Sequence, residues 1–225
     1  EYTLDTFNLA KSKGLMTNYV TNGSLTAEAL DEIGPYLDAY RVDIKGFSKE
    51  ACQSVANFPN FQGILDVAAM AKTKWGMHVE CVTNIIPTMN DDRNGLRGIA
   101  KWIADCLGRD VPWHVTRFVP HADFGYLRPT PLATLEQARA IGLGEGLRFV
   151  YLVNVPGHIA ENTYCPECGR ILVLRIGLAL PEVVLEHGAC PDCGYQLLGR
   201  WRCCTCLTEI KYTGKQPIVR ISNFS

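Results

Sequence analysis

The chain has 225 residues, 47% of them hydrophobic, which is enough for one full domain and a smaller second one. Its formal net charge of −1 excludes the broad basic surface on which simple nucleic-acid binding depends, so nucleic acid is not an expected partner. The most apolar stretch, residues 171–185, contains Arg175, Gly177, Pro181 and Glu182, so no membrane span is expected. Because no secretion signal is visible, we predict a cytoplasmic protein.

Residues 1–155 alternate between segments with helical spacing of apolar residues and short apolar segments typical of strands. Thr26 is a candidate N-cap for one helix, and Gly14 follows a basic turn of the kind that ends a helix. Helices are expected within residues 6–12, 26–40, 61–75, 96–107 and 132–143, and strands within 16–20, 42–44, 77–86, 115–119 and 147–153.

This alternation predicts a parallel sheet with right-handed crossovers. The sheet could be a closed barrel, part of a barrel, or an open doubly wound sheet, but about five strand–helix steps are too few for a complete eight-stranded barrel. After Pro156 the pattern changes to short hairpins and cysteine turns. We therefore predict two domains, residues 1–161 and 162–225.

Polar residues stand at the ends of four successive predicted strands. They are Thr21-Asn22-Gly23, Asp43 to Lys45, Thr83-Asn84, and His114 to Arg117. Because the carboxyl ends of parallel strands collect ligand and catalytic groups, four such ends predict one rim around one ligand. Three of them also have a simpler explanation: Asn-Gly is a common turn, Asp43 and Lys45 could form a buried structural ion pair, and Arg117 could be solvated.

The ten cysteines fall into two groups. Cys52, Cys81 and Cys106 are isolated in core-like segments, where a free cysteine behaves as a small hydrophobic residue. The other seven lie within residues 165–206, and four of them form two C-P-x-C-G turns separated by 21 residues. That spacing predicts a tetrahedral zinc site, although an iron–sulfur cluster also takes four thiolates. The predicted ligands are Cys165, Cys168, Cys190 and Cys193.

Cys203, Cys204 and Cys206 stand close to the second cysteine turn. They could form a second partial site, replace one of the four predicted ligands, or remain free.

Several segments, in this order, resemble the radical S-adenosylmethionine (SAM) enzymes of the AmmeMemoRadiSam system, relatives of the pyruvate formate-lyase activating enzymes. The resemblance runs from Glu1 to about Trp201, and its most specific part is the last segment. The segments are V-T-N-G (20–23), P-Y-L-D-A-Y-R-V-D-I-K-G-F (35–47), N-I-I-P-T-M-N-D (84–91), P-W-H-V-T-R-F-V-P (112–120), P-T-P (129–131) and N-V-P-G-H-I-A-E-N-T-Y-C-P-E-C-G (154–169).

The resemblance implies a partial (β/α) barrel followed by a small zinc-ribbon-like β domain. It implies a [4Fe–4S] cluster held by C-x-x-x-C-x-x-C, with SAM bound to its open iron. Reductive cleavage of SAM would then yield a 5′-deoxyadenosyl radical that attacks a protein or a small molecule. A reductant such as flavodoxin or ferredoxin would supply the electron.

The family's cofactor contacts map onto five positions of this chain. Thr21 and Asn22 would lie near the methionine or ribose part of SAM, and Asp43 and Lys45 match the family's D-x-K motif. Lys45 is a cation suited to the methionine carboxylate. His121 falls near the position of a cofactor-contacting histidine.

The chain departs from the family at one important point, because it contains no C-x-x-x-C-x-x-C and no G-G-E-type motif. It therefore resembles the carboxyl-terminal two-thirds of such an enzyme, lacking the first strands of the barrel, and is expected to be inactive alone. An alternative is a zinc-ribbon binding or scaffold module without catalysis. A basic tail would serve such a module, with Arg200, Arg202, Lys211, Lys215 and Arg220 as its cations.

Overall fold

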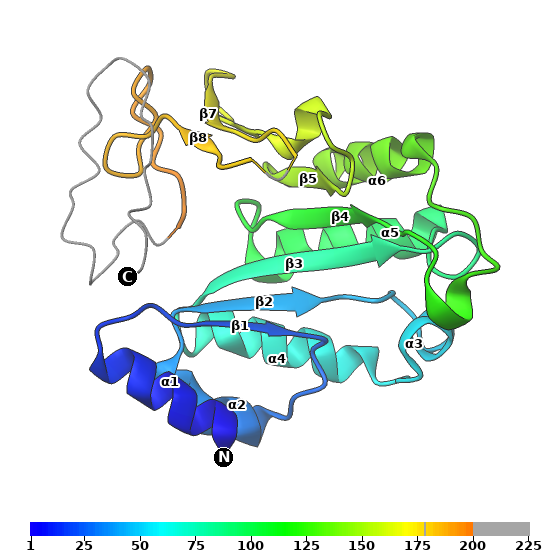
Figure 1. The fold of residues 1–225 in the computed structure, drawn as a ribbon, viewed down its shortest axis with the longest axis horizontal. Coiled ribbons are helices and arrows are strands. Elements are labelled where there is room, and N and C mark those ends of the chain that lie inside the picture. The colour runs from blue at the N-terminus through cyan, green and yellow to red at the C-terminus, as the bar shows by residue number, and fades with distance from the viewer. Residues whose placement is uncertain (178, 200–225) are drawn as a thin grey trace.

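The computed structural model describes residues 1–177 and 179–199, so the predictions for Cys203, Cys204, Cys206 and the basic tail lie outside the described residues. Its main feature is a parallel five-stranded sheet in the order β1-β2-β3-β4-β5 (Figure 1). The strands are β1 (Asn18–Thr21), β2 (Ala39–Asp43), β3 (His78–Ile85), β4 (Trp113–Arg117) and β5 (Val150–Val153). Because each strand pairs with its successor in the sequence, the sheet is a continuously wound segment of a barrel rather than a doubly wound sheet.

The described residues contain six α-helices and four shorter helical turns; α1 precedes the first strand, and the others lie between strands. The α-helices are α1 (Tyr2–Ser12), α2 (Ala27–Ile33), α3 (Lys49–Ala56), α4 (Phe61–Thr73), α5 (Arg93–Trp102) and α6 (Leu132–Gly144). The shorter turns are η1 (Gly34–Tyr36), η2 (Ile103–Leu107), η3 (Ala122–Phe124) and η4 (Ile159–Glu161). None of the described helices is long and apolar enough to cross a bilayer.

The predicted helix over residues 26–40 is correct at its start and wrong at its end. Thr26 caps α2, since its Oγ1 accepts a hydrogen bond from the backbone N–H of Ala29 at 3.2 Å. The α-helix stops at Ile33, and Pro35, which has no backbone N–H to donate, lies in the 3₁₀ turn that follows. The next strand consequently begins at Ala39, three residues before the predicted start.

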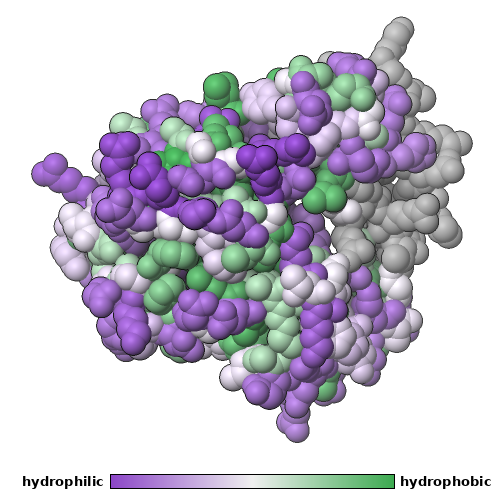
Figure 2. All heavy atoms as spheres, turned by 180° about the vertical axis from the view of Figure 1, so that it is seen from behind, coloured by the Kyte–Doolittle hydropathy of each residue, from purple (hydrophilic) through white to green (hydrophobic). Residues whose placement is uncertain are grey.

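Alternation along the strands divides the sheet into two chemically different faces. One face packs against the helices and is apolar, with Tyr40, Val42 and Trp113 among its fully buried residues. Seen from behind, this helix-covered side of the molecule shows hydrophilic side chains interspersed with hydrophobic ones (Figure 2). The opposite face carries polar side chains at the intervening positions, such as Arg41 and Glu80, which are paired neighbours on β2 and β3.

The cysteine-rich segment forms its own antiparallel sheet in the order β6-β7-β8. These strands are β6 (Thr163–Tyr164), β7 (Ile171–Leu174) and β8 (Glu182–Val183). Leu172 and Leu185 are fully buried in a second hydrophobic core, which also contains Phe149 from the residue just before β5. The predicted domain division after residue 161 stays a prediction, although the second sheet does begin at Thr163.

Candidate functional site

The ends of β1 and β2 bring the first predicted residues to one edge of the sheet. The strand register places Thr21 beside Val42. The Thr21 Oγ1 accepts a hydrogen bond from the N–H of Gly23 at 3.1 Å, and the Asn22 Oδ1 accepts one from the N–H of Ser24 at 3.0 Å. Both side chains therefore shape a tight turn, and the left-handed φ of 81° at Gly23 suits a glycine.

Asp43 and Lys45 form an ion pair at the same edge. The Lys45 Nζ lies 2.6 Å from the Asp43 Oδ2, and the two side chains are 21% and 30% exposed. Lys45 and Asn22 also line a cavity of about 210 Å³, together with Cys52 and Phe58. The pair is thus neither fully buried nor remote from a cavity, and a ligand carboxylate could compete with Asp43 for the lysine.

Asn90, which the sequence reasoning did not single out, holds this edge together. It is 3% exposed and makes three hydrogen bonds. Its Oδ1 accepts from the N–H of Ile86 at 2.7 Å, while its Nδ2 donates to the carbonyls of Lys45 at 2.7 Å and Asn84 at 2.9 Å. Asn90 therefore fixes the backbone of Lys45 against the end of β3. An asparagine in a loop gives no sequence signal for such a role.

Two buried polar atoms lie on neighbouring strands just before this edge. Asn84 on β3 and Thr116 on β4 are register partners. The Oδ1 of Asn84 and the Oγ1 of Thr116 are inaccessible and have no hydrogen-bond partner among the described residues. Buried polar atoms are normally paired, so these two are candidates for contact with a polar ligand or water.

The other predicted residues of the rim are more loosely placed. Arg117 is used within the fold, since its Nε donates to the carbonyl of Thr130 at 3.0 Å. His121 is exposed, in the loop between β4 and η3. Among the described residues, no hydrogen bond or ion pair joins His121 to Lys45 or Asp43. The structure therefore brings Asn22 and Lys45 to one cavity, with Thr21 and Asp43 at the same strand ends, and the role of His121 stays a prediction.

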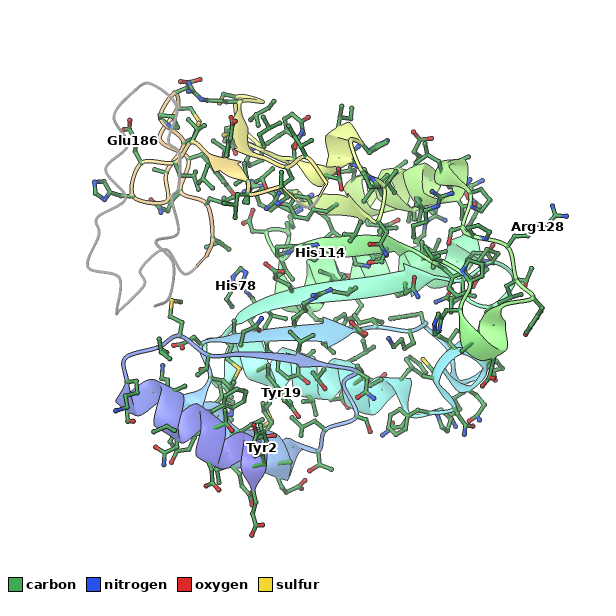
Figure 3. The ribbon with its side chains drawn as sticks, in the orientation of Figure 1. Tyr2, Tyr19, His78, His114, Arg128 and Glu186 are labelled. Atoms are coloured by element: carbon green, nitrogen blue, oxygen red, sulfur yellow. The ribbon has the colours of Figure 1, made fainter. Side chains whose placement is uncertain are left out.

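A second polar cluster lies on the same face of the sheet, closer to the amino-terminal ends of the strands (Figure 3). The Glu80 carboxylate lies between two imidazoles, with the His78 Nε2 at 3.0 Å from Oε1 and the His114 Nε2 at 2.9 Å from Oε2. Burial acts to raise the pKa of Glu80, but the hydrogen bonds from His114 and His78 outweigh it and hold that pKa well below its usual range. The His114 ring also stacks on Tyr151 at 5.1 Å between centroids. Sequence reasoning considered His114 alone and missed its partners, although the period-two spacing of His78 and Glu80 could have revealed them.

The four predicted metal ligands converge on one point. Their sulfur atoms all lie within 4.8 Å of one another, with Cys165 and Cys190 buried and Cys168 and Cys193 exposed. The Cys165–Cys193 and Cys168–Cys190 sulfur separations are 3.4 and 3.6 Å. A tetrahedral ion with Zn–S bonds of about 2.3 Å requires sulfurs about 3.8 Å apart, so this arrangement suits a single metal ion.

The two cysteine turns have the same backbone design. Gly169 and Gly194 follow the second cysteine of each turn with φ values of 77° and 74°, a conformation that favours glycine. Their N–H groups donate to the carbonyls of Cys165 at 2.9 Å and Cys190 at 2.8 Å. Burial opposes ionisation of Cys190, but the backbone N–H groups near it lower the pKa of that thiol to about 7, which favours the thiolate form that binds metals.

Comparison with known proteins gives one sequence relative and a structural likeness. No protein-family model matches the chain. The uncharacterized protein MJ0808 of Methanocaldococcus jannaschii is 39% identical over 178 residues, which are 78% of this chain and 51% of that protein. The chain therefore spans about half the length of this curated relative.

Among solved structures, a domain of the pyruvate-formate lyase-activating enzyme of Bacteroides vulgatus aligns with a TM-score of 0.56 and 16% identity, over 66% of this chain and 88% of that one. A radical SAM methyltransferase of Sphaerobacter thermophilus aligns with a TM-score of 0.49 and 14% identity, over 68% of this chain and 43% of that one. The first likeness, with the parallel sheet and the four clustered cysteines, confirms the predicted fold class: an α/β fold like that of the activating-enzyme domain, followed by a zinc-ribbon-like segment.

Proposed function

We propose that this chain is the carboxyl-terminal part of a radical SAM enzyme related to the activating enzymes of the AmmeMemoRadiSam system, and that it holds the amino-acid end of SAM. The observation that carries the proposal is the Asp43–Lys45 pair, which lies at the carboxyl edge of a sheet whose fold resembles an activating-enzyme domain. Strand ends at this edge are where barrel enzymes place their ligands.

The residues present suit SAM. The Lys45 ammonium matches the methionine carboxylate, and the Asp43 carboxylate matches the methionine ammonium, so the two charges that now pair with each other would each find a partner on SAM. Asn84 and Thr116 add a carboxamide oxygen and a hydroxyl without partners among the described residues. When bound to a reduced cluster, SAM supplies a 5′-deoxyadenosyl radical.

The residues present do not suit the [4Fe–4S] cluster that radical SAM chemistry requires. The sequence has no C-x-x-x-C-x-x-C, and the four clustered cysteines, which belong to the separate β6-β7-β8 segment, are arranged for one ion. We therefore derive no catalytic step from this chain. The protein or small-molecule radical target, the flavodoxin- or ferredoxin-like reductant and the cytoplasmic location remain parts of the proposal.

The cysteine site, in this proposal, holds one structural zinc ion. A cubane cluster binds each thiolate to a different iron at its own corner, so its four sulfurs must lie further apart than those around one ion. Sulfur separations of 3.4 and 3.6 Å support the single ion. Metal analysis of the purified chain should find about one zinc per chain and no visible iron–sulfur absorption. Stoichiometric iron with acid-labile sulfide would contradict this assignment.

The test of the SAM site uses the complete natural protein that contains this chain, reconstituted anaerobically with iron and sulfide. With a chemical reductant, we expect it to release 5′-deoxyadenosine from SAM. Substituting Lys45→Met should weaken SAM binding at least about tenfold, because it removes a charge-assisted hydrogen bond worth about 1.5–3 kcal/mol. The matched control is Lys49→Met, at an exposed lysine in the first turn of α3.

Two results would refute the SAM proposal. One is a complete protein that assembles a cluster but neither binds nor cleaves SAM. The other is a Lys45→Met variant that binds SAM as well as Lys49→Met does. Either outcome would favour the binding or scaffold module, which predicts a zinc-loaded protein with no SAM-dependent activity.

A further inference from the structure

We propose a second ligand site, at the opposite end of the strands from Lys45, for a small molecule that carries a carboxylate or phosphate group on an apolar body. A cavity of about 440 Å³ lies there, between the amino-terminal edge of the parallel sheet and the β6-β7-β8 sheet. Its volume falls in the range of about 300–1,000 Å³ that is typical of small-molecule sites. The sheet contributes Ala39 and His114 to its wall, and the cysteine-rich segment contributes Val173 and Arg175.

The three carboxylates that line this cavity all have partners. Glu80 lies between two imidazoles, as described above. Asp38 lies 2.8 Å from the Lys11 Nζ and accepts a hydrogen bond from the N–H of Thr17. Asp110 accepts from the Tyr195 hydroxyl at 2.8 Å and lies 3.2 Å from Arg148. The negative charge of the lining is therefore already balanced.

Arg175 is different, because it is the one permanent cation among the described lining residues and has no carboxylate partner among them. Its Nη1 donates to the Glu161 carbonyl and to the Thr163 Oγ1, both at 2.9 Å. Its guanidinium also lies over the Tyr151 ring, 5.3 Å from the centroid. These contacts hold the guanidinium in place, and the hydrogen bonds to Glu161 and Thr163 both come from Nη1.

A fixed guanidinium with unused donors selects an anion. Arginine binds carboxylates and phosphates through paired N–H groups, and an arginine that is already ordered loses little entropy when it does so. Apart from a hydrogen-bonding interaction with the Tyr151 hydroxyl, no described residue accepts from the Nε and Nη2 of Arg175, and no described carboxylate competes with a ligand anion for them. The ligand should therefore present a planar or tetrahedral anionic group to Arg175.

The remaining lining defines the rest of the ligand. Phe149, Val173, Pro181 and Val183 form an apolar wall, which suits a hydrocarbon or aromatic body. The Nε2 atoms of His78 and His114 are both occupied by the Glu80 carboxylate, so the Nδ1 atom of each ring is the one left for a ligand. A hydroxyl group on the ligand, which can donate or accept, would suit these Nδ1 atoms.

This site is separate from the proposed SAM site. Ala39, which lines the cavity, is the first residue of β2, and Lys45 lies two residues beyond the end of that strand, at most about 20 Å away at 3.3 Å per residue. Binding at the cavity therefore needs neither SAM nor a cluster. Because the cavity wall comes from both sheets, a bound ligand should also stabilise their contact.

The test uses the full 225-residue chain and three probes that share a phenyl ring: benzoate, the nearly isosteric neutral benzamide, and phenyl phosphate. Binding is followed by NMR chemical-shift changes and by thermal unfolding. Benzoate and phenyl phosphate should bind in the millimolar range, with benzamide about tenfold weaker, because a hydrogen bond to a charged group exceeds a neutral one by about 1.4 kcal/mol. The Arg175→Gln variant should lose this preference for anions. Arg128→Gln, at an exposed loop residue far from His78 and His114 (Figure 3), should keep it.

A second variant covers the case in which Arg175→Gln fails to fold. Ala39→Leu fills the cavity from the sheet side without touching Arg175, and it should weaken binding of all three probes. Lys45→Met should leave probe binding unchanged, so failure of the SAM proposal and failure of this one are distinguishable. Equal binding of benzoate and benzamide, or no binding of any probe at about 10 mM, would overturn the proposal.

Discussion

Replacing Asn90 by alanine tests whether this buried carboxamide holds the carboxyl edge of the sheet. The substitution removes three hydrogen bonds, to Ile86, Lys45 and Asn84, at a site that is 3% exposed. Each intramolecular hydrogen bond contributes about 1 kcal/mol net, and a buried backbone group left without a partner costs about 1–3 kcal/mol. Because water could reach some of these groups after truncation, we expect a total loss of about 2–4 kcal/mol.

The measurement is urea and thermal unfolding of the full chain, followed by circular dichroism. For a protein of this size, 1 kcal/mol corresponds to about 2–4 °C, so the midpoint should fall by about 4–16 °C. Asn94→Ala is the matched control, because Asn94 is exposed in the first turn of α5. In the complete protein, Asn90→Ala should also weaken SAM binding, because the backbone of Lys45 is no longer held.

A loss below about 0.5 kcal/mol for Asn90→Ala would refute this reasoning, since surface substitutions commonly fall within that range. So would an equal loss for Asn94→Ala. A stable variant that nevertheless binds SAM poorly would separate the positioning role of Asn90 from its structural role.

Three further predictions concern other parts of the fold. Because folding lowers the pKa of Glu80, its carboxylate stabilises the fold above its unfolded pKa near 4.5, and this stability is lost as pH falls through the folded pKa. The difference in unfolding free energy between wild type and Glu80→Gln should therefore be full at pH 7 and shrink below about pH 4.5. Urea titrations at a series of pH values measure it. Cys190→Ser should release the metal and unfold the β6-β7-β8 segment, as metal analysis and limited proteolysis would show, whereas Cys106→Ser, at an exposed isolated cysteine, should retain it. Gly98→Ala should cost about 1–3 kcal/mol in thermal unfolding, because the new Cβ would overlap the Phe47 ring; a fully stable variant would show that this ring moves freely.

The edge of the sheet formed by β1 bears on the proposed relation to a longer enzyme. Among the described residues β1 pairs with β2 alone, and Val20 is 58% exposed. Unpaired strand edges template the addition of further strands. In the longer enzyme that we propose, this edge of β1 is where a further strand would pair.

Local sequence patterns determined much of this structure. The alternation of segments predicted the parallel sheet, Thr26 predicted the start of α2, and the two C-P-x-C-G turns predicted the convergence of four sulfurs. The cap and each cysteine turn depend on a few neighbouring residues, because a cap bonds to an N–H three residues away and a cysteine turn closes on its own backbone. Such short-range physics can be read from sequence alone.

Only the tertiary structure decided which distant residues meet. Asn90 bonds to Lys45, 45 residues away in the sequence, and Glu80 bonds to His114, 34 residues away. The Arg175 guanidinium, just after β7, lies over the ring of Tyr151 on β5. These contacts arise because parallel pairing places strands from separate parts of the chain side by side, and the register that selects one neighbour over another is set by the packing of the whole sheet. The sequence could therefore indicate that a polar rim exists, whereas the network that holds Lys45 and the second cavity followed from the fold.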